Sequence, residues 1–210
     1  MQANARHAAW VEAWRALGVQ APDNAPSNAL FDALLARYGE AHRAYHTLQH
    51  LDECLAALAL ERSHAKRPAE IALALWFHDA IYDVHRHDNE ERSADWARQA
   101  LRDAGVDADA AQRVHALVMA TRHQAQPQEA DAQLLVDIDL SILGAPPARF
   151  AEYERQIRIE YAHVPADSFE PRRREILGSF LARDPLYLTP SIRARLEAQA
   201  RLNLQRAMMV

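Results

Sequence analysis

Apolar side chains recur at helical spacing along almost the whole chain, and this periodicity limits the fold more than any other feature of the sequence. The first stripe consists of Ala8, Val11, Trp14 and Leu17. Similar stripes follow, and no segment alternates apolar and polar residues as a half-buried strand does. Only 5 glycines interrupt a chain rich in alanine, leucine, glutamate and arginine, which are strong helix formers. The sequence therefore predicts an all-α fold of roughly nine or ten helices.

The length and composition of the chain favour one domain. Its 210 residues, of which 50% are hydrophobic, are enough for one sizeable core. No low-complexity tract, internal repeat or linker divides the sequence. We therefore expect a single helical domain over residues 1–210.

Charge, hydropathy and cysteine usage restrict the location and the partners. A net charge of −5 argues against broad nucleic-acid binding, which requires a cationic surface. No run approaches the roughly 20 apolar residues of a membrane-spanning helix, and residues 1–7 lack the pattern of a secretory signal. Cys54 is the only cysteine, which excludes an internal disulfide and a zinc site based on cysteines. These features predict a cytoplasmic protein without a membrane partner and leave the oligomeric state open.

His78 and Asp79 are the polar pair that most needs a partner. They follow the apolar segment Ile71–Phe77, which would be buried on nearly every face of a helix. A buried imidazole and carboxylate are costly unless a charge or hydrogen bond compensates them. Neighbouring residues on a helix point about 100° apart, so both side chains can face one ion at a helix end. The pair therefore predicts two ligands of a bound cation.

A second candidate element is Tyr45-His46-Thr47-Leu48-Gln49-His50. His46 and His50 are four residues apart, so on a helix they share one face. This spacing allows two metal ligands, or one ligand and one acid–base group. The segment differs from the H-E-x-x-H signature of metalloproteases, because Thr47 stands where that signature has its glutamate.

The third element is Asp137-Ile138-Asp139-Leu140, inside another apolar helix. A carboxylate in such a helix is rarely buried without a partner. Asp137 and Asp139 lie about 200° apart around a helix, so we expect only one of them to face inward. The apolar neighbours of Asp139 favour it as the buried carboxylate and as the ligand, and leave Asp137 as a bystander.

Together these elements predict one divalent metal ion bound by nitrogen and oxygen atoms, with positions left for water. The residue types do not distinguish Mn²⁺, Fe²⁺, Zn²⁺, Co²⁺, Ni²⁺ and Mg²⁺. His85, His87, Asp83 and Glu90 follow the His78-Asp79 pair and are candidates for a second metal, although the polarity of a loop explains them equally well.

The order H…HD…D on an all-helical chain resembles the HD-domain superfamily of metal-dependent phosphohydrolases. The resemblance spans Tyr45 to Gly144. The sequences around the ligands, Trp-Phe-His-Asp-Ala and Asp-x-Asp-Leu-x-Ile-Leu-Gly, are similar to those of a bacterial group of small predicted HD proteins. It implies a metal-site core at about residues 45–144, with His50, His78, Asp79 and Asp139 as ligands. The first element also resembles the Y-H-N-x-x-H element of cyclic-nucleotide phosphodiesterases, which implies that His46 is the general acid; this chain has Thr47 in place of the asparagine.

A phosphoryl substrate requires cationic groups or N–H donors near the metal. His123 ends a predicted helix between the second and third metal elements and is one candidate. Arg158 and Arg172 are candidate phosphate-binding residues, because the C-terminal stretch also resembles the small HD group. A solvated helical face with salt bridges is the simpler interpretation of these arginines.

The predicted function is a metal-dependent phosphohydrolase that hydrolyses a phosphoester of a small metabolite or nucleotide through metal-activated water. In that mechanism Asp79 orients the metal or the water, and His46 protonates the leaving group. The alternatives are a non-catalytic metal- and nucleotide-binding module and a di-iron oxygenase of the HD type. The sequence does not identify the substrate.

Overall fold

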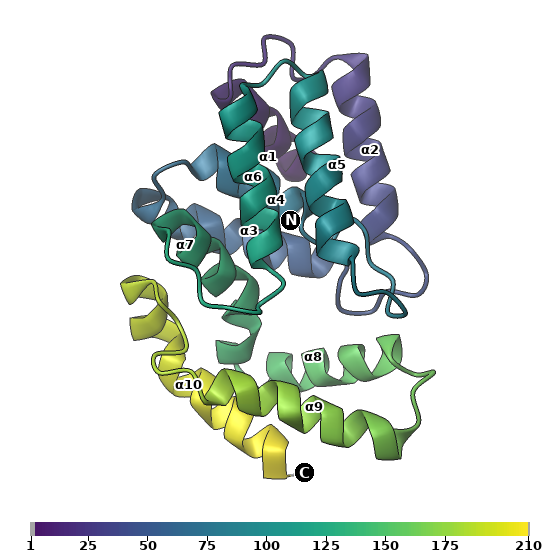
Figure 1. Ribbon diagram of the computed structural model, residues 1–210, viewed down its shortest axis with the longest axis vertical. Helices are drawn as coiled ribbons and strands as arrows, with labels where there is room; N and C mark the ends of the chain where they lie inside the picture. The colour runs from purple at the N-terminus through teal and green to yellow at the C-terminus, as the bar shows by residue number, and fades with distance from the viewer. Residues whose placement is uncertain (1–2, 210) are drawn as a thin grey trace. The chain divides into compact units, whose positions relative to one another are not determined.

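The computed structural model describes residues 3–209, without the side chains of residues 25 and 26, and the regular secondary structure of this part of the chain consists of helices alone (Figure 1). Residues 1 and 2, part of the segment examined for a secretory signal, lie outside it. The α-helices are α1 (Ala3–Ala16), α2 (Ala25–Tyr38), α3 (Leu48–Glu61), α4 (Pro68–Phe77), α5 (Asn89–Asp103), α6 (Ala108–Ala120), α7 (Ala130–Asp139), α8 (Pro147–Glu160), α9 (Ala166–Leu181) and α10 (Pro190–Met209). Two short 3-10 helices are η1 (Arg62–His64) and η2 (Leu140–Gly144). The predicted all-α fold of nine or ten helices is confirmed.

The chain forms two compact units, Met1–Val136 and Asp137–Val210. Their boundary falls inside α7 and inside the predicted metal-site core at residues 45–144. The prediction of a single domain over residues 1–210 therefore stays a prediction. Each unit has its own core.

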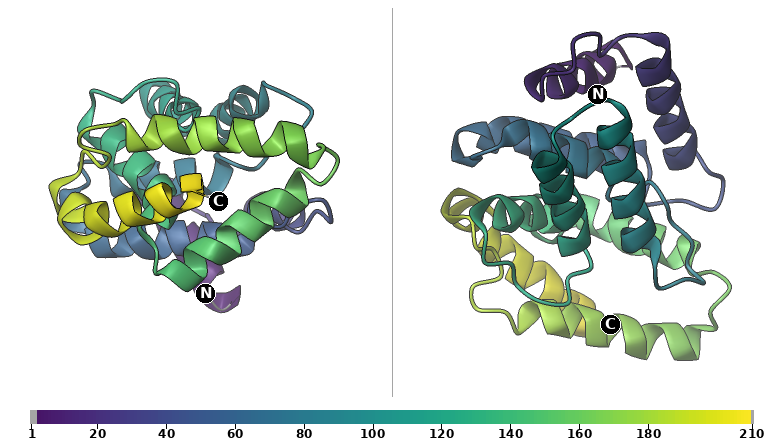
Figure 2. Two further views of the ribbon diagram at one scale, coloured as in Figure 1. Left: turned by 90° about the horizontal axis from the view of Figure 1, so that it is seen from below. Right: turned by 45° about the horizontal axis from the view of Figure 1, so that its top comes forward.

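Helix α4 is the centre of the first unit, and it packs against α1, α3, α5 and α6. Its residues from Leu73 to Phe77 are fully buried, as expected for a helix that is apolar on every face. Complete burial of a side chain such as Phe77 contributes about 1.5–3 kcal/mol. Helices α5 and α6 run side by side in the same unit (Figures 1 and 2).

An aromatic cluster fixes α1 and α2 on α4. The rings of Trp10 and Trp76 meet edge to face with their centroids 5.3 Å apart, and Trp14 and Phe31 pack on Trp10. Such edge-to-face pairs are worth about 0.5–1.5 kcal/mol beyond the area that they bury. These tryptophans are part of the core.

Helix α4 ends at Phe77, directly before His78 and Asp79. The last carbonyl groups of a helix lack intrahelical donors. Here the Tyr38 hydroxyl donates to the carbonyls of Leu75 and Trp76, at 3.4 and 3.2 Å. His78 and Asp79 therefore lie in the turn that follows α4 and not in the helix itself.

In the second unit, α10 packs against α9 and η2 (Figures 1 and 2). The amide of Asn203 donates to the carbonyls of Leu143 and Ala145, at 2.9 and 2.8 Å. Gly144 is required at this contact, because an added Cβ would lie 2.7 Å from the Cβ atom of Leu196. The glycine thus allows close packing of α10 on η2, besides ending the 3-10 helix.

No helix among residues 3–209 combines the length and the apolar character that crossing a membrane requires.

Candidate metal centre

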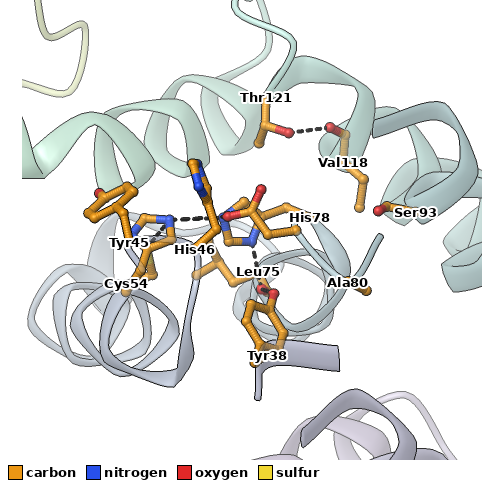
Figure 3. Close-up of polar contacts among 12 residues, drawn as sticks. Tyr38, Tyr45, His46, Cys54, Leu75, His78, Ala80, Ser93, Val118 and Thr121 are labelled. Carbon is orange, nitrogen blue, oxygen red and sulfur yellow. Dashed lines mark hydrogen bonds and ion pairs between the residues drawn. The ribbon is translucent and has the colours of Figure 1, made fainter. Parts of the chain in front are cut away.

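Two segments of the first unit bring the candidate ligands together. The turn after α4 carries His78 and Asp79, while the first half of α3 carries His50 and Cys54 one helical turn apart. Thr47 fixes the start of α3 as its N-cap, with the side-chain oxygen accepting from the amide of Gln49. Figure 3 shows the side chains of Cys54 and His78 gathered at this place.

The ligand atoms of these side chains converge on one point. The Nε2 atoms of His50 and His78 lie 3.1 Å apart. The Oδ2 atom of Asp79 lies 2.9 Å from Nε2 of His78 and 3.5 Å from Nε2 of His50. Two atoms bound at about 2.0–2.2 Å to one ion are about 2.9–3.6 Å apart when they subtend octahedral or tetrahedral angles. The three separations therefore suit a common divalent ion.

The protonation pattern of His78 also favours a cation. Its Nδ1 atom lies 2.8 Å from the carbonyl oxygen of Leu75, which can only accept, so Nδ1 carries the hydrogen (Figure 3). In the neutral ring Nε2 then presents a lone pair toward His50 and Asp79. A metal-ligating histidine characteristically donates its other N–H in this way to a carbonyl.

Asp79 supplies negative charge at the same point. Its Oδ2 atom is buried and receives no hydrogen bond of normal geometry from the described residues. Burial favours the neutral acid, but protonated His78, His46 and His50, together with a hydrogen bond from His78, outweigh it and hold the pKa of Asp79 below its usual range. When His78 is instead neutral, with its hydrogen on Nδ1, a bound cation would compensate the charge of this carboxylate.

Arg43 holds the two segments together, and sequence reasoning missed it. Its side chain is fully buried. The guanidinium donates to the carbonyls of His46, Asp79 and Ala80, at 3.1, 2.6 and 3.2 Å. Its Nε atom also donates to the carboxylate of Glu40, at 3.1 Å. Backbone carbonyls have no sequence signature, so no pattern could have indicated this role.

Ser93 on α5 fixes the chain just beyond the metal segment. Its hydroxyl is fully buried, accepts from the amide of Ile81 at 3.0 Å and lies 3.5 Å from the carbonyl of the same residue. Farther along, the amide side chain of Asn89 pairs with both backbone groups of Asp83. The turn that carries His78 and Asp79 is therefore held from both sides.

His46, the predicted general acid, lies next to the cluster but is not one of the grouped ligands. Its ring stacks on Tyr82 with centroids 4.1 Å apart, and its centroid lies 6.1 Å from that of His50. His46 lies before α3, which starts at Leu48. The expected shared helical face of His46 and His50 is therefore absent, and His46 is held by stacking instead.

Cys54 is a further member of the group, and the sequence reasoning did not name it as a candidate ligand. Single ligand atoms of His50, Cys54 and His78 all lie within 4.8 Å of one another. The count of one cysteine excludes a site made of several thiolates, but it leaves a mixed site possible. The i, i+4 spacing of His50 and Cys54 was the signal that could have found it.

Asp137 and Asp139 belong to the second unit, and the expectation about their burial was wrong. Asp137 is the buried one, with 1% of its surface exposed, whereas Asp139 is half-buried. The carboxylate of Asp137 accepts a hydrogen bond from the amide of Thr189. Burial raises the pKa of Asp137, while the hydrogen bonds from Thr189 oppose the rise. Asp137 therefore has a structural role in the second unit. That Asp139 is a metal ligand stays a prediction.

The predicted substrate-binding residues lie in different surroundings. His123 is half-buried after α6 and has a φ of 55°, a left-handed conformation that non-glycine residues seldom adopt. Arg158, in the second unit, donates to the carbonyls of Tyr161 and Val164 at 2.6 and 3.0 Å. Arg172 is exposed and pairs with Glu175. The two arginines thus have local structural partners, and all three substrate roles stay predictions.

Within residues 3–209, the group around His50 and His78 is the one set of three or more potential metal ligands. Asp83 accepts from the amide of His85, and His85 and His87 form no second set. A second metal at that loop stays a prediction.

Comparisons with protein-family models, with curated proteins and with solved structures give no match to this chain. Its function must therefore be argued from the cluster.

Proposed function

We propose that this chain is a metal-dependent phosphohydrolase that hydrolyses a phosphoester of a small metabolite or nucleotide in the cytoplasm. The observation that supports it most is the convergence of His50 Nε2, His78 Nε2 and Asp79 Oδ2 at 2.9–3.5 Å. The proposal also uses the resemblance of the sequence to the HD-domain superfamily.

The proposed metal set is His50, His78, Asp79 and, from the sequence alone, Asp139. A divalent cation in such a site supplies activation of water and stabilises charge on phosphoryl oxygens. The Nδ1–H group of His78 donates to the carbonyl of Leu75, which leaves Nε2 of the same ring free to bind the ion. Asp79 contributes negative charge and orients either the ion or the water.

His46 is the proposed proton donor to the leaving oxygen. Its stacking on Tyr82 and its edge-to-face contact with the His50 ring hold it beside the proposed metal ligands. His123, Arg158 and Arg172 remain the proposed contacts to the phosphate group.

The test is a phosphoester screen of the purified protein with added Mn²⁺, Mg²⁺, Co²⁺ and Ni²⁺. We expect turnover with at least one of these ions in the wild type and in His64→Ala, a control that removes an exposed histidine of the same unit. His78→Ala should lose both metal and turnover, and Asp139→Asn should weaken metal binding. Phosphatase activity retained in metal-free His78→Ala would contradict the proposal.

The same measurements separate the alternatives. Tight nucleotide binding without turnover, with every ion tested, would favour a non-catalytic module. Two irons per chain and an oxygen-dependent reaction would favour a di-iron oxygenase.

A further inference from the structure

A cavity of about 580 Å³ lies between the end of α1, the start of α2 and the second half of α5 (Figure 1). Its volume is within the range of about 300–1,000 Å³ that is typical of sites for small organic ligands. The described residues that line it all belong to the first unit, and none of them is in the metal cluster. The cavity is therefore a separate place at which this unit can bind a molecule.

The walls of the cavity are mainly apolar and include two indole rings. The apolar lining residues are Trp14, Trp96, Val19, Leu30, Ala100 and Ala104. The ring of Trp14 packs edge to face on Trp10, with centroids 5.3 Å apart. The ring of Trp96 packs edge to face on Phe77 at 5.7 Å, and the guanidinium of Arg37 lies over it at 5.9 Å. These contacts hold both indoles in place, so the walls are already formed to pack against an aromatic ring.

The polar groups that line the cavity include one carboxylate and no cation among the described residues. Asp103 is exposed, and its Oδ1 atom accepts a hydrogen bond from Nε2 of Gln99 at 2.7 Å. The Oδ2 atom of the same carboxylate is open to a ligand. The other polar lining residues, Asn24, Ser27 and Gln99, are neutral. A phosphate group would therefore lack a cationic partner here, whereas a cationic nitrogen has one in Asp103.

We propose that this cavity binds a small aromatic molecule with a positively charged nitrogen. The aromatic ring packs against the indoles and the aliphatic side chains, and the nitrogen donates to Asp103. Burial of the ring supplies most of the affinity, since an ion pair with an exposed carboxylate is weak. The carboxylate instead selects the charge of the ligand. This inference does not depend on the metal ion or on the proposed phosphohydrolase activity.

Isothermal titration calorimetry of the full chain with two probes tests the proposal. Tryptamine carries an ammonium group, and indole-3-propionate has the same ring with a carboxylate. We expect tryptamine to bind about tenfold more tightly, because Asp103 attracts one probe and repels the other. Asp103→Asn should remove most of this difference. Glu91→Gln, an equal change of charge at an exposed position of α5 that does not line the cavity, should retain it.

A second substitution tests the location of the binding. Ala100→Phe places a ring in the cavity and should weaken the binding of both probes. Circular dichroism shows whether each variant is folded, and Leu30→Ala, which removes an apolar contact, supplies the same test if Ala100→Phe does not fold. Wild type that binds neither probe, or both equally, would overturn the proposal. A preference for tryptamine that persists in Asp103→Asn, or binding unchanged in folded Ala100→Phe, would also overturn it.

Discussion

At the scale of single residues, the site depends on a buried arginine as much as on its ligands. Arg43 lies between the rings of Tyr38 and Tyr82, with its guanidinium carbon 5.5 and 5.4 Å from their centroids. It also binds the backbone of the segments that carry His46 and Asp79. Such outer partners of metal ligands typically change metal affinity 10–100-fold when they are removed.

Replacing Arg43 with methionine should therefore affect folding and metal binding together. The change removes the guanidinium donor from three carbonyl groups and one of the two arginine partners of Glu40, which should lower the free energy of unfolding by about 2–4 kcal/mol. Metal affinity should fall about 10–100-fold. Urea denaturation and metal titration measure the two effects.

Arg37→Met is the matched control, because Arg37 pairs with the same Glu40 from an exposed position. Its removal should cost less than about 1 kcal/mol, as for other surface ion pairs, and should leave metal affinity unchanged. Equal effects of the two substitutions would contradict a positioning role for Arg43.

The lowered pKa of Glu40 predicts that the free energy of unfolding depends on pH. Burial raises the pKa of Glu40, but hydrogen bonds from Arg37 and Arg43 outweigh it, so the pKa in the folded protein lies below its usual value. Its contribution to stability is therefore complete above the pKa of the unfolded chain, about 4.3, and is lost as the pH falls through the lower folded value. Denaturation of wild type and Glu40→Gln should differ most near neutral pH and converge in acid. A difference that grows as the pH falls would contradict this assignment.

At the scale of elements, the helix ends determine what each motif can do. Asp79 follows the end of α4, where the chain turns, so it and His78 can reach one point although they are neighbours. Tyr38 and His78 use the free carbonyls at that end as acceptors. A longer α4 would direct the two side chains about 100° apart around the helix.

The contact between η2 and α10 gives a prediction for the second unit. Gly144→Ala places a Cβ atom 2.7 Å from Cβ and 2.9 Å from the carbonyl oxygen of Leu196. Overpacking of this kind should lower the free energy of unfolding by about 1–3 kcal/mol, measured by denaturation. Gly39→Ala is the control, since its nearest neighbour would be at 3.4 Å. If both substitutions cost the same, the close approach of α10 does not explain the glycine.

At the scale of the whole molecule, the sequence predicted the fold class better than the site. The apolar stripes were sufficient for an all-α fold because helical periodicity is local. The burial order of Asp137 and Asp139 was predicted wrongly, since the partner of Asp137 is the amide of Thr189, 52 residues away. Arg43 was missed for the same reason, because its partners are backbone carbonyls that packing brings to it. Cys54 was missed although its i, i+4 spacing from His50 was visible in the sequence.

The central claim is that His50, His78 and Asp79 bind one divalent ion, and metal titration of the purified chain tests it most directly. Equilibrium dialysis with Zn²⁺, Co²⁺ and Mn²⁺, followed by elemental analysis, should find one tightly bound ion per chain in the wild type and in His64→Ala. His78→Ala, folded by circular dichroism, should bind none at the same free concentration. Equal metal content in folded His78→Ala, or no bound metal in the wild type, would contradict the account.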